Sequence, residues 1–85
     1  MKIKSTVVID KLEGKTVILD TENNIFVELN DIGGAVIDYI KNNEGCKMDS
    51  IINYVKKEYD VLDNDVEEDL TDFIQGLFQE RILEE

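Results

Sequence analysis

The side chains in this sequence that are capable of chemistry are mostly carboxylates, and they gather near the C-terminus. Residues 58–85 hold eleven acidic residues and one base, Arg81, whereas residues 1–57 hold nine acids and eight lysines. General acid–base catalysis needs a carboxyl group with a shifted pKa in a shielded pocket. These acids fall instead on a predicted helix and near its first turn, where the helix dipole favours negative charge. We therefore interpret them as a solvated surface and expect no catalytic residue.

Metal and thiol chemistry have equally little support. The sequence contains no histidine, and Cys46 is its only cysteine. These counts exclude an intrachain disulfide and a zinc site rich in histidine or cysteine. Cys46 follows Gly45 in a polar segment, which is typical of an ordinary loop thiol, and a reactive or dimer-bridging thiol is the alternative. We expect no metal and no cofactor.

Ser50 lies in a recognisable sequence setting. The tripeptide Asp49-Ser50-Ile51, at the start of a predicted helix, resembles the Asp-Ser-Leu of acyl carrier proteins, whose serine carries phosphopantetheine. Carrier proteins are also small and acidic, so an acyl or peptidyl carrier with phosphopantetheine on Ser50 is the alternative function. A carrier would need a helix and a long loop where this chain has three β-branched runs. We therefore interpret Ser50 as an ordinary serine of the first helical turn.

Three short, apolar, β-branched runs occupy the first third of the chain, at residues 6–10, 16–19 and 25–29. Gly14 in the first connection is free to adopt a positive φ, and Asn24 in the second tolerates the left-handed region. Two short turns between three consecutive runs predict an antiparallel three-stranded meander.

Beyond residue 30 the apolar period changes from two residues to about 3.6, which predicts helices. They cover about residues 31–41, about residues 48–58, and a third segment from about residue 64. Their apolar faces are Ile32, Val36, Ile37 and Ile40; Met48, Ile51, Ile52 and Val55; and Val66, Leu70, Phe73, Ile74, Leu77 and Phe78. Ile82 and Leu83 are expected to fold back onto the core.

The start of the first helix combines a cap with two glycines. Asn30 or Asp31 can cap this helix, because a short side-chain oxygen satisfies the free N–H groups of the first turn. Gly33 and Gly34 weaken the helix by up to about 1 kcal/mol each relative to alanine. We expect such a cost where a neighbouring element packs closely against the helix.

Size and charge limit the partners. A chain of 85 residues forms one domain, residues 1–85, which buries only about 60% of its unfolded surface and has no room for a deep active site. Its net charge of −11 repels nucleic-acid phosphates and anionic lipid, and favours a neutral or basic partner. The sequence has neither an apolar run of about 18 residues nor a signal-peptide pattern. We expect a cytoplasmic, non-catalytic protein that binds neither nucleic acid nor membrane.

Three strands followed by three helices predict an α+β fold that resembles a winged helix. Such folds often bind DNA through a recognition helix, which needs Arg or Lys toward phosphates and base edges. The last predicted helix carries no base before Arg81. We therefore expect the fold to serve another kind of ligand.

Residues along nearly the whole chain resemble the PqqD-like family, the small peptide-binding domains called RiPP recognition elements. The resemblance rests on Leu29-Asn30 at the end of the third strand, the spacing from Ile37 to Ile40, Ile51-Ile52, Tyr59-Asp60, Asp69-Leu70, Phe73-Ile74, Leu77 and Ile82-Leu83. Two positions depart from the family pattern. Lys47 stands where a capping Ser or Thr is common, and Arg81 stands where Gly is frequent. Both departures affect helix ends rather than the binding groove.

The resemblance implies a module that binds the leader segment of a ribosomally made precursor peptide. In this family the leader adds as a strand to the edge of the third strand and lies against the third helix. Backbone groups of an edge strand then give affinity, while pockets for side chains give specificity. The implied leader-peptide-binding residues are Ile25, Phe26, Val27, Glu28 and Leu29 of the strand, and Val66, Asp69, Phe73 and Gly76 of the helix. For Val66 and Phe73, simple core packing is the alternative.

The resemblance also implies the partners. A stand-alone domain of this kind presents the precursor leader peptide to a modifying enzyme or leader protease in natural product biosynthesis, of which lasso peptide maturation is one example. An adaptor for some other peptide is a further interpretation. The same edge strand also leaves open a homodimer of the chain.

Overall fold

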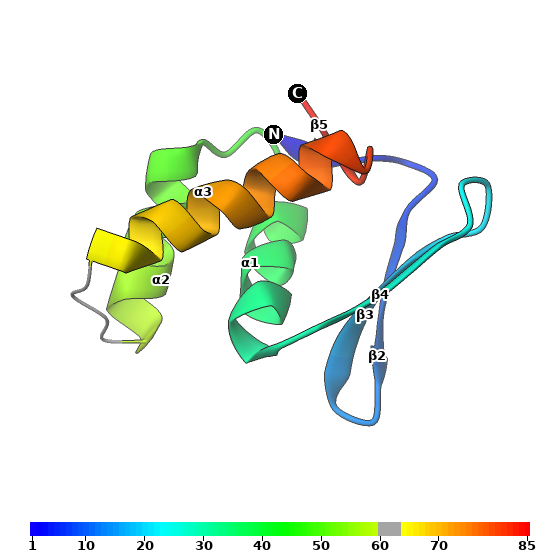
Figure 1. Ribbon diagram of the computed structural model, residues 1–85, viewed down its shortest axis with the longest axis horizontal. Coiled ribbons are helices and arrows are strands. Elements are labelled where there is room, and N and C mark those ends of the chain that lie inside the picture. The colour runs from blue at the N-terminus through cyan, green and yellow to red at the C-terminus, as the bar shows by residue number, and fades with distance from the viewer. Residues whose placement is uncertain (60–63) are drawn as a thin grey trace.

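The computed structural model describes residues 1–59 and 64–85, so Asp60 of the Tyr59-Asp60 pair lies outside the described residues. The described elements are β1 (Lys2–Ile3), β2 (Val8–Leu12), β3 (Lys15–Asp20), β4 (Ile25–Leu29), α1 (Asp31–Asn42), α2 (Met48–Tyr59), α3 (Asn64–Gln79) and β5 (Leu83–Glu84). Figure 1 shows the helices gathered at one end and the β2–β4 sheet extending away from the first turn of α1. The predicted α+β order of three antiparallel strands followed by three helices is confirmed.

The main sheet is an antiparallel meander in the order β2-β3-β4. β4 has the predicted bounds, whereas the first predicted strand is shifted: β2 begins at Val8 rather than Thr6 and continues to Leu12. It can continue because Glu13 and Gly14 alone make the turn to β3. Both residues have positive φ, 53° and 82°, as a two-residue type I′ hairpin turn requires.

The turn between β3 and β4 is organised by the carboxylate of Asp20. Its oxygens accept hydrogen bonds from the Asn23 side-chain amide at 2.8 Å and from the backbone N–H groups of Glu22 and Asn23. The Thr6 hydroxyl donates a further bond at 3.2 Å. Asn24 ends the turn in the left-handed region with φ 54°, as its residue type predicted. This turn sets the point at which β4 begins.

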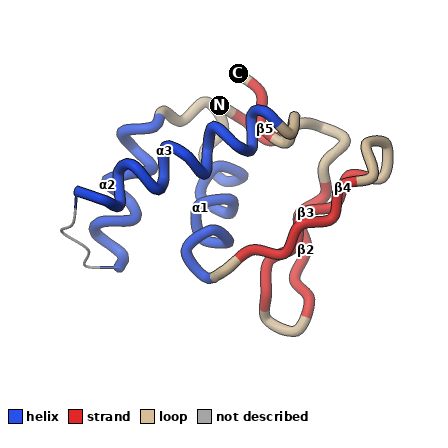
Figure 2. The backbone as a smooth tube through the Cα atoms, viewed as in Figure 1, coloured by secondary structure: helices blue, strands red, loops and turns tan. Residues whose placement is uncertain are grey.

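A second, very small sheet joins the two ends of the described chain. β1 pairs antiparallel with β5, with Lys2 opposite Glu84 and Ile3 opposite Leu83 (Figure 2). Two-residue strands carry no periodic pattern, so β1 and β5 could not be predicted from the sequence. The prediction that Ile82 and Leu83 return to the core is confirmed, because they are 1% and 3% exposed.

α3 ends in a Schellman motif. The N–H of Ile82 donates to the Leu77 carbonyl at 2.9 Å, and the N–H of Arg81 donates to the Phe78 carbonyl at 3.0 Å. Arg81 lies in the left-handed region with φ 61°. This is the position of the motif where glycine is the usual residue, because glycine has no Cβ to collide with the backbone.

The helices and the inner face of the sheet share one core. Its buried members are Ile18, Leu29, Val36, Ile37, Ile40, Ile51, Val55, Leu70, Ile74, Leu77, Ile82 and Leu83. The predicted apolar faces therefore point inward, with one informative exception. Ile32, assigned to the buried face of the first helix, is 37% exposed.

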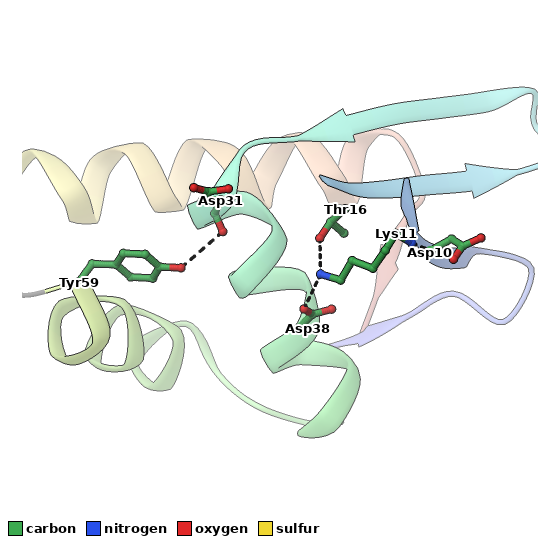
Figure 3. A network of polar contacts seen from close by, with 6 residues as sticks. All are labelled: Asp10, Lys11, Thr16, Asp31, Asp38 and Tyr59. Atoms are coloured by element: carbon green, nitrogen blue, oxygen red, sulfur yellow. Dashed lines mark hydrogen bonds and ion pairs between the residues drawn. The ribbon is translucent and has the colours of Figure 1, made fainter. Parts of the chain in front are cut away.

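α1 packs closely on β3 at Gly34. A Cβ added at this glycine would lie 2.5 Å from Thr16 Oγ1 and 3.0 Å from Thr16 Cβ, so a side chain does not fit. Beside this contact the Lys11 ammonium donates to Thr16 Oγ1 at 2.6 Å and to Asp38 at 3.1 Å (Figure 3). The expectation that these helical glycines mark a close approach is confirmed, and the hairpin is held to α1.

Candidate functional site

β4 is an edge strand with an unoccupied side. In the described residues it pairs with β3 alone, and the late strand β5 pairs with β1 instead. Its side chains alternate: Leu29 is buried and Ile25 and Val27 are half-buried, whereas Phe26 and Glu28 are exposed. A strand has two rows of backbone donors and acceptors, so the row facing away from β3 is available to a guest strand.

A small pocket begins where β4 ends. It measures about 230 Å³ and is lined by Asn30, Ile32 and Gly33 around the start of α1 and by Asp69, Leu70 and Phe73 of α3. Pockets for small molecules typically span about 300–1,000 Å³. The volume therefore suits one or two side chains of a peptide better than a free cofactor.

The local sequence explains how the pocket is built. Asn30 Oδ1 accepts the N–H of Gly33 at 2.7 Å, which caps α1 directly after β4. A Cβ on Gly33 would lie 3.4 Å from both Leu29 Cβ and Phe73 Cζ. The tightest neighbour of such a Cβ would be Asn30 Oδ1 at 3.1 Å, so Gly33 lies closely between the capping side chain and the Phe73 ring. Of the two predicted caps for this helix, Asn30 is the one used.

The predicted helix residues divide into two pairs. Asp69 and Phe73 line the pocket, with Asp69 exposed and Phe73 half-buried. Val66 is half-buried against the core and does not line it. Gly76 also lies outside the lining, and a Cβ added there would meet nothing within 4 Å.

Part of the pocket was not predicted from the sequence. Ile32 was predicted to belong to the core, whereas it lines the pocket and is 37% exposed, and Gly33 was expected to mark a close approach but not to line a pocket. Leu70 was assigned to the core, where it is 5% exposed, and it also lines the pocket. One sequence signal was available: Ile32 follows the strand-ending pair Leu29-Asn30 closely, so it has to lie near the end of the edge strand.

The electrostatics of this region are dominated by α3. Asp69 at the pocket and Asp72 one turn further are exposed carboxylates, whereas Glu67 pairs with Lys56 at 2.6 Å. On β4, Glu28 pairs with Lys15 at 3.0 Å, and both side chains are largely exposed. A basic peptide would meet a favourable field here, with an effect on association rate and salt dependence.

The groups with shifted pKa lie away from the pocket. The pKa of Asp20 is lowered, chiefly by the hydrogen bond from the Asn23 side chain, and the pKa of Tyr54 is raised, chiefly by burial. Neither lines the pocket. Among residues 1–59 and 64–85, no three Asp, Glu or Cys side chains converge in a way that could hold a metal ion.

Two further alternatives concern the phosphopantetheine role of Ser50 and a membrane-spanning helix. Ser50 is the exposed third residue of α2, and residues 8–29 form a sheet where a carrier protein would need a helix and a long loop. The carrier interpretation is therefore not supported. Separately, none of the described helices has the length and apolarity needed to cross a membrane.

Comparison with known proteins gives matches along most of the chain. A family model described as coenzyme PQQ synthesis protein D (PqqD) matches residues 15–83. The solved structure of TbiB1 in complex with the TbiA(beta) leader peptide is 28% identical, with a TM-score of 0.83 over 99% of this chain and 95% of that chain. Lasso peptide synthetase B1 complexed with the leader peptide is 17% identical, with a TM-score of 0.78 over 95% and 93%, and shows likeness of fold alone. Among curated protein sequences, none matches.

Proposed function

The chain belongs to the PqqD family, and on that premise we propose that it binds the leader segment of a ribosomally made precursor peptide. In this proposal it catalyses no step itself. It presents the leader to a modifying enzyme or leader protease and requires no cofactor. The structural unit is the single domain formed by residues 1–85.

The observation that carries this proposal is the likeness to TbiB1. That protein was solved in complex with a leader peptide, and the match covers 99% of this chain with a TM-score of 0.83. A lasso peptide pathway is the first to test, because lasso peptide maturation is one of the pathways that the family resemblance implies.

The proposed binding mode uses the edge of β4 that faces away from β3 and the pocket at the end of that strand. The leader adds as a fourth strand beside β4, along Ile25–Leu29, so that its backbone pairs with the free row of N–H and C=O groups. Alternate side chains of the leader then face the same side as Leu29 and reach toward Asp69 and Phe73. Backbone pairing supplies affinity for many sequences, and the pocket supplies the preference among them.

Amide hydrogen exchange tests this mode. The probe is a synthetic leader segment of a precursor peptide, to be sought among the genes that neighbour the gene for this chain. We expect its binding to slow exchange at Ile25–Leu29 while leaving β2, the opposite edge at Val8–Leu12, unchanged. Tight binding that protects β2 and not β4 would refute the mode, and absence of binding would refute the function.

The carrier alternative has its own direct test. Intact mass is measured after incubation with a phosphopantetheinyl transferase and coenzyme A, with Ser50→Ala as the control. We expect no mass increase in either protein. An increase that Ser50→Ala abolishes would restore the carrier function.

A further inference from the structure

Three apolar side chains form a row across the outer face of the main sheet. Val8 lies opposite Leu19 in the β2–β3 pairing, and Leu19 lies opposite Phe26 in the β3–β4 pairing. Val8 and Phe26 are 56% and 62% exposed, and Leu19 is half-buried. A single exposed apolar residue needs no explanation, but a row of cross-strand neighbours is a continuous surface.

The row ends at the open edge of the sheet. Phe26 is its last member, and β4 has no strand beyond it in the described residues. Its neighbours Ile25 and Val27 point to the other face and pack against the core. Phe26 is therefore directed away from the pocket formed by α1 and α3, and the pocket lining does not include it.

This inference rests on the proposed function. We propose that Phe26 is a specificity-determining residue, which selects leaders with an apolar side chain on their outward face. A strand added to β4 would bring the residue opposite Phe26 to about 4.5–5.5 Å between Cβ atoms, and aromatic or β-branched pairs at that distance are favourable. The peptide is then recognised on both faces: inward by the pocket and outward by Phe26.

Glu28 extends the same argument to charge. It lies two residues along β4 from Phe26, so both side chains are on the outer face. Its pair with Lys15 is solvent-exposed, which limits the strength of that contact and leaves the second carboxylate oxygen for another donor. The leader position opposite Glu28 therefore favours Lys or Arg. The outward pattern of the leader is an apolar and a basic residue separated by one position.

An alternative occupant of this surface is the modifying enzyme. The peptide is favoured because the row reaches the β4 edge, where the proposed function places the leader, so an added strand becomes the immediate neighbour of Phe26. An enzyme that docks on the sheet face would contact Val8 on the far strand as well. The two occupants therefore differ in whether Val8 matters.

The register is mapped first by disulfide trapping. Phe26→Cys is made with Cys46→Ser and mixed with versions of the same synthetic leader, each carrying one cysteine. The directly opposed position should crosslink fastest, because a disulfide needs Cα atoms about 4.4–6.8 Å apart. We expect the native leader residue at that position to be apolar. We also expect Lys or Arg at the leader residue two positions away, on the side that lies opposite Glu28. A charged or glycine residue at the opposed position overturns the inference.

Affinity then tests the pair itself. Phe26→Thr keeps a good strand-forming residue and should weaken leader binding about fivefold, the effect expected for a cross-strand aromatic pair. The loss should nearly vanish when the opposed leader residue is already threonine. Val8→Thr is the matched control, exposed on the same face but on the opposite edge strand β2, and should leave affinity unchanged.

The possible outcomes distinguish a failure of this inference from a failure of the proposed leader-binding function. If the leader binds and protects β4 but Phe26→Thr has parent affinity, the function stands and the outward specificity is refuted. If Val8→Thr and Phe26→Thr both leave leader affinity unchanged and both weaken association with the modifying enzyme, the row is an enzyme contact. The inference is then again refuted. If the leader does not bind, both fall together.

Discussion

The Phe73 ring lies beside Gly33, at the place where the first turn of α1 meets the middle of α3 and where both residues line the pocket. A Cβ placed on Gly33 would be 3.4 Å from Phe73 Cζ. The same ring packs against the core and lines the pocket beside β4. Phe73 therefore stands at the boundary between the core and the pocket, and its role in binding the leader stays a prediction.

Replacing Phe73 by alanine should affect binding more than folding. We expect the free energy of leader binding to become less favourable by about 2 kcal/mol, as for an interface anchor. The free energy of unfolding should fall by less than the about 3–5 kcal/mol typical of a fully buried phenylalanine, because Phe73 is half-buried. Urea unfolding and leader titration on one preparation give both values.

Phe78→Ala is the matched control for that experiment. Phe78 is also a half-buried aromatic of α3 packed against the core, but it does not line the pocket. It should lose comparable stability and retain leader affinity. Equal losses of affinity in the two variants would mean that the pocket is not where the leader side chain binds.

The exposed carboxylates of Asp69 and Asp72 on α3 predict that association with the leader depends on salt. Converting Asp69 and Asp72 to asparagine should slow binding of a basic leader and flatten the dependence of its on-rate on ionic strength, because rim charges act mainly through steering. Stopped-flow association at several salt concentrations measures this. Glu13→Gln with Glu22→Gln removes two exposed charges from the hairpin turns as a control. If both double variants have the parent slope, the acids of α3 serve solubility alone.

Asp20 predicts a loss of stability in acid. Hydrogen bonds, above all from Asn23, hold its pKa below the ordinary value for aspartate. A folded-state pKa below the unfolded value means that the stabilisation is complete above the ordinary pKa of about 4 and is lost as the pH falls below it. Urea midpoints between pH 7 and pH 3 should therefore fall less steeply for Asp20→Asn than for the parent. Glu22→Gln, the charge control in the same turn, should keep the parent slope; the same flattening there would remove Asp20 as the cause.

The elements that the sequence predicted well are those whose signals are local. The bounds of β4 follow from alternation between two turns, and the cap at Asn30 follows from its residue type and its place after a strand. Gly34 was expected to mark a close approach, but the partner, Thr16, could not be named. That contact depends on how α1 lies on β3, which no short segment encodes.

The parts that the sequence did not predict depend on distant pairing. β1 and β5 are each two residues long and are defined only by each other. The pocket likewise joins the start of α1 to the middle of α3, so Ile32 was read from the helical period as a core residue. The outward row from Val8 to Phe26 needs the register of two strand pairs, and the alternation within one strand cannot supply it.

The end of α3 offers a prediction about stability that is independent of the ligand. Arg81 occupies the left-handed position of the Schellman motif, with φ 61°, where a residue with a Cβ costs about 1–2 kcal/mol. Arg81→Gly should therefore raise the free energy of unfolding by about 1 kcal/mol, after allowance for the greater freedom of glycine in the unfolded chain. Arg81→Ala removes the same charge but keeps the Cβ, so it should bring no such gain. Urea unfolding of the three proteins measures the difference, and equal midpoints for the glycine and alanine variants would show that charge, not backbone conformation, governs this position.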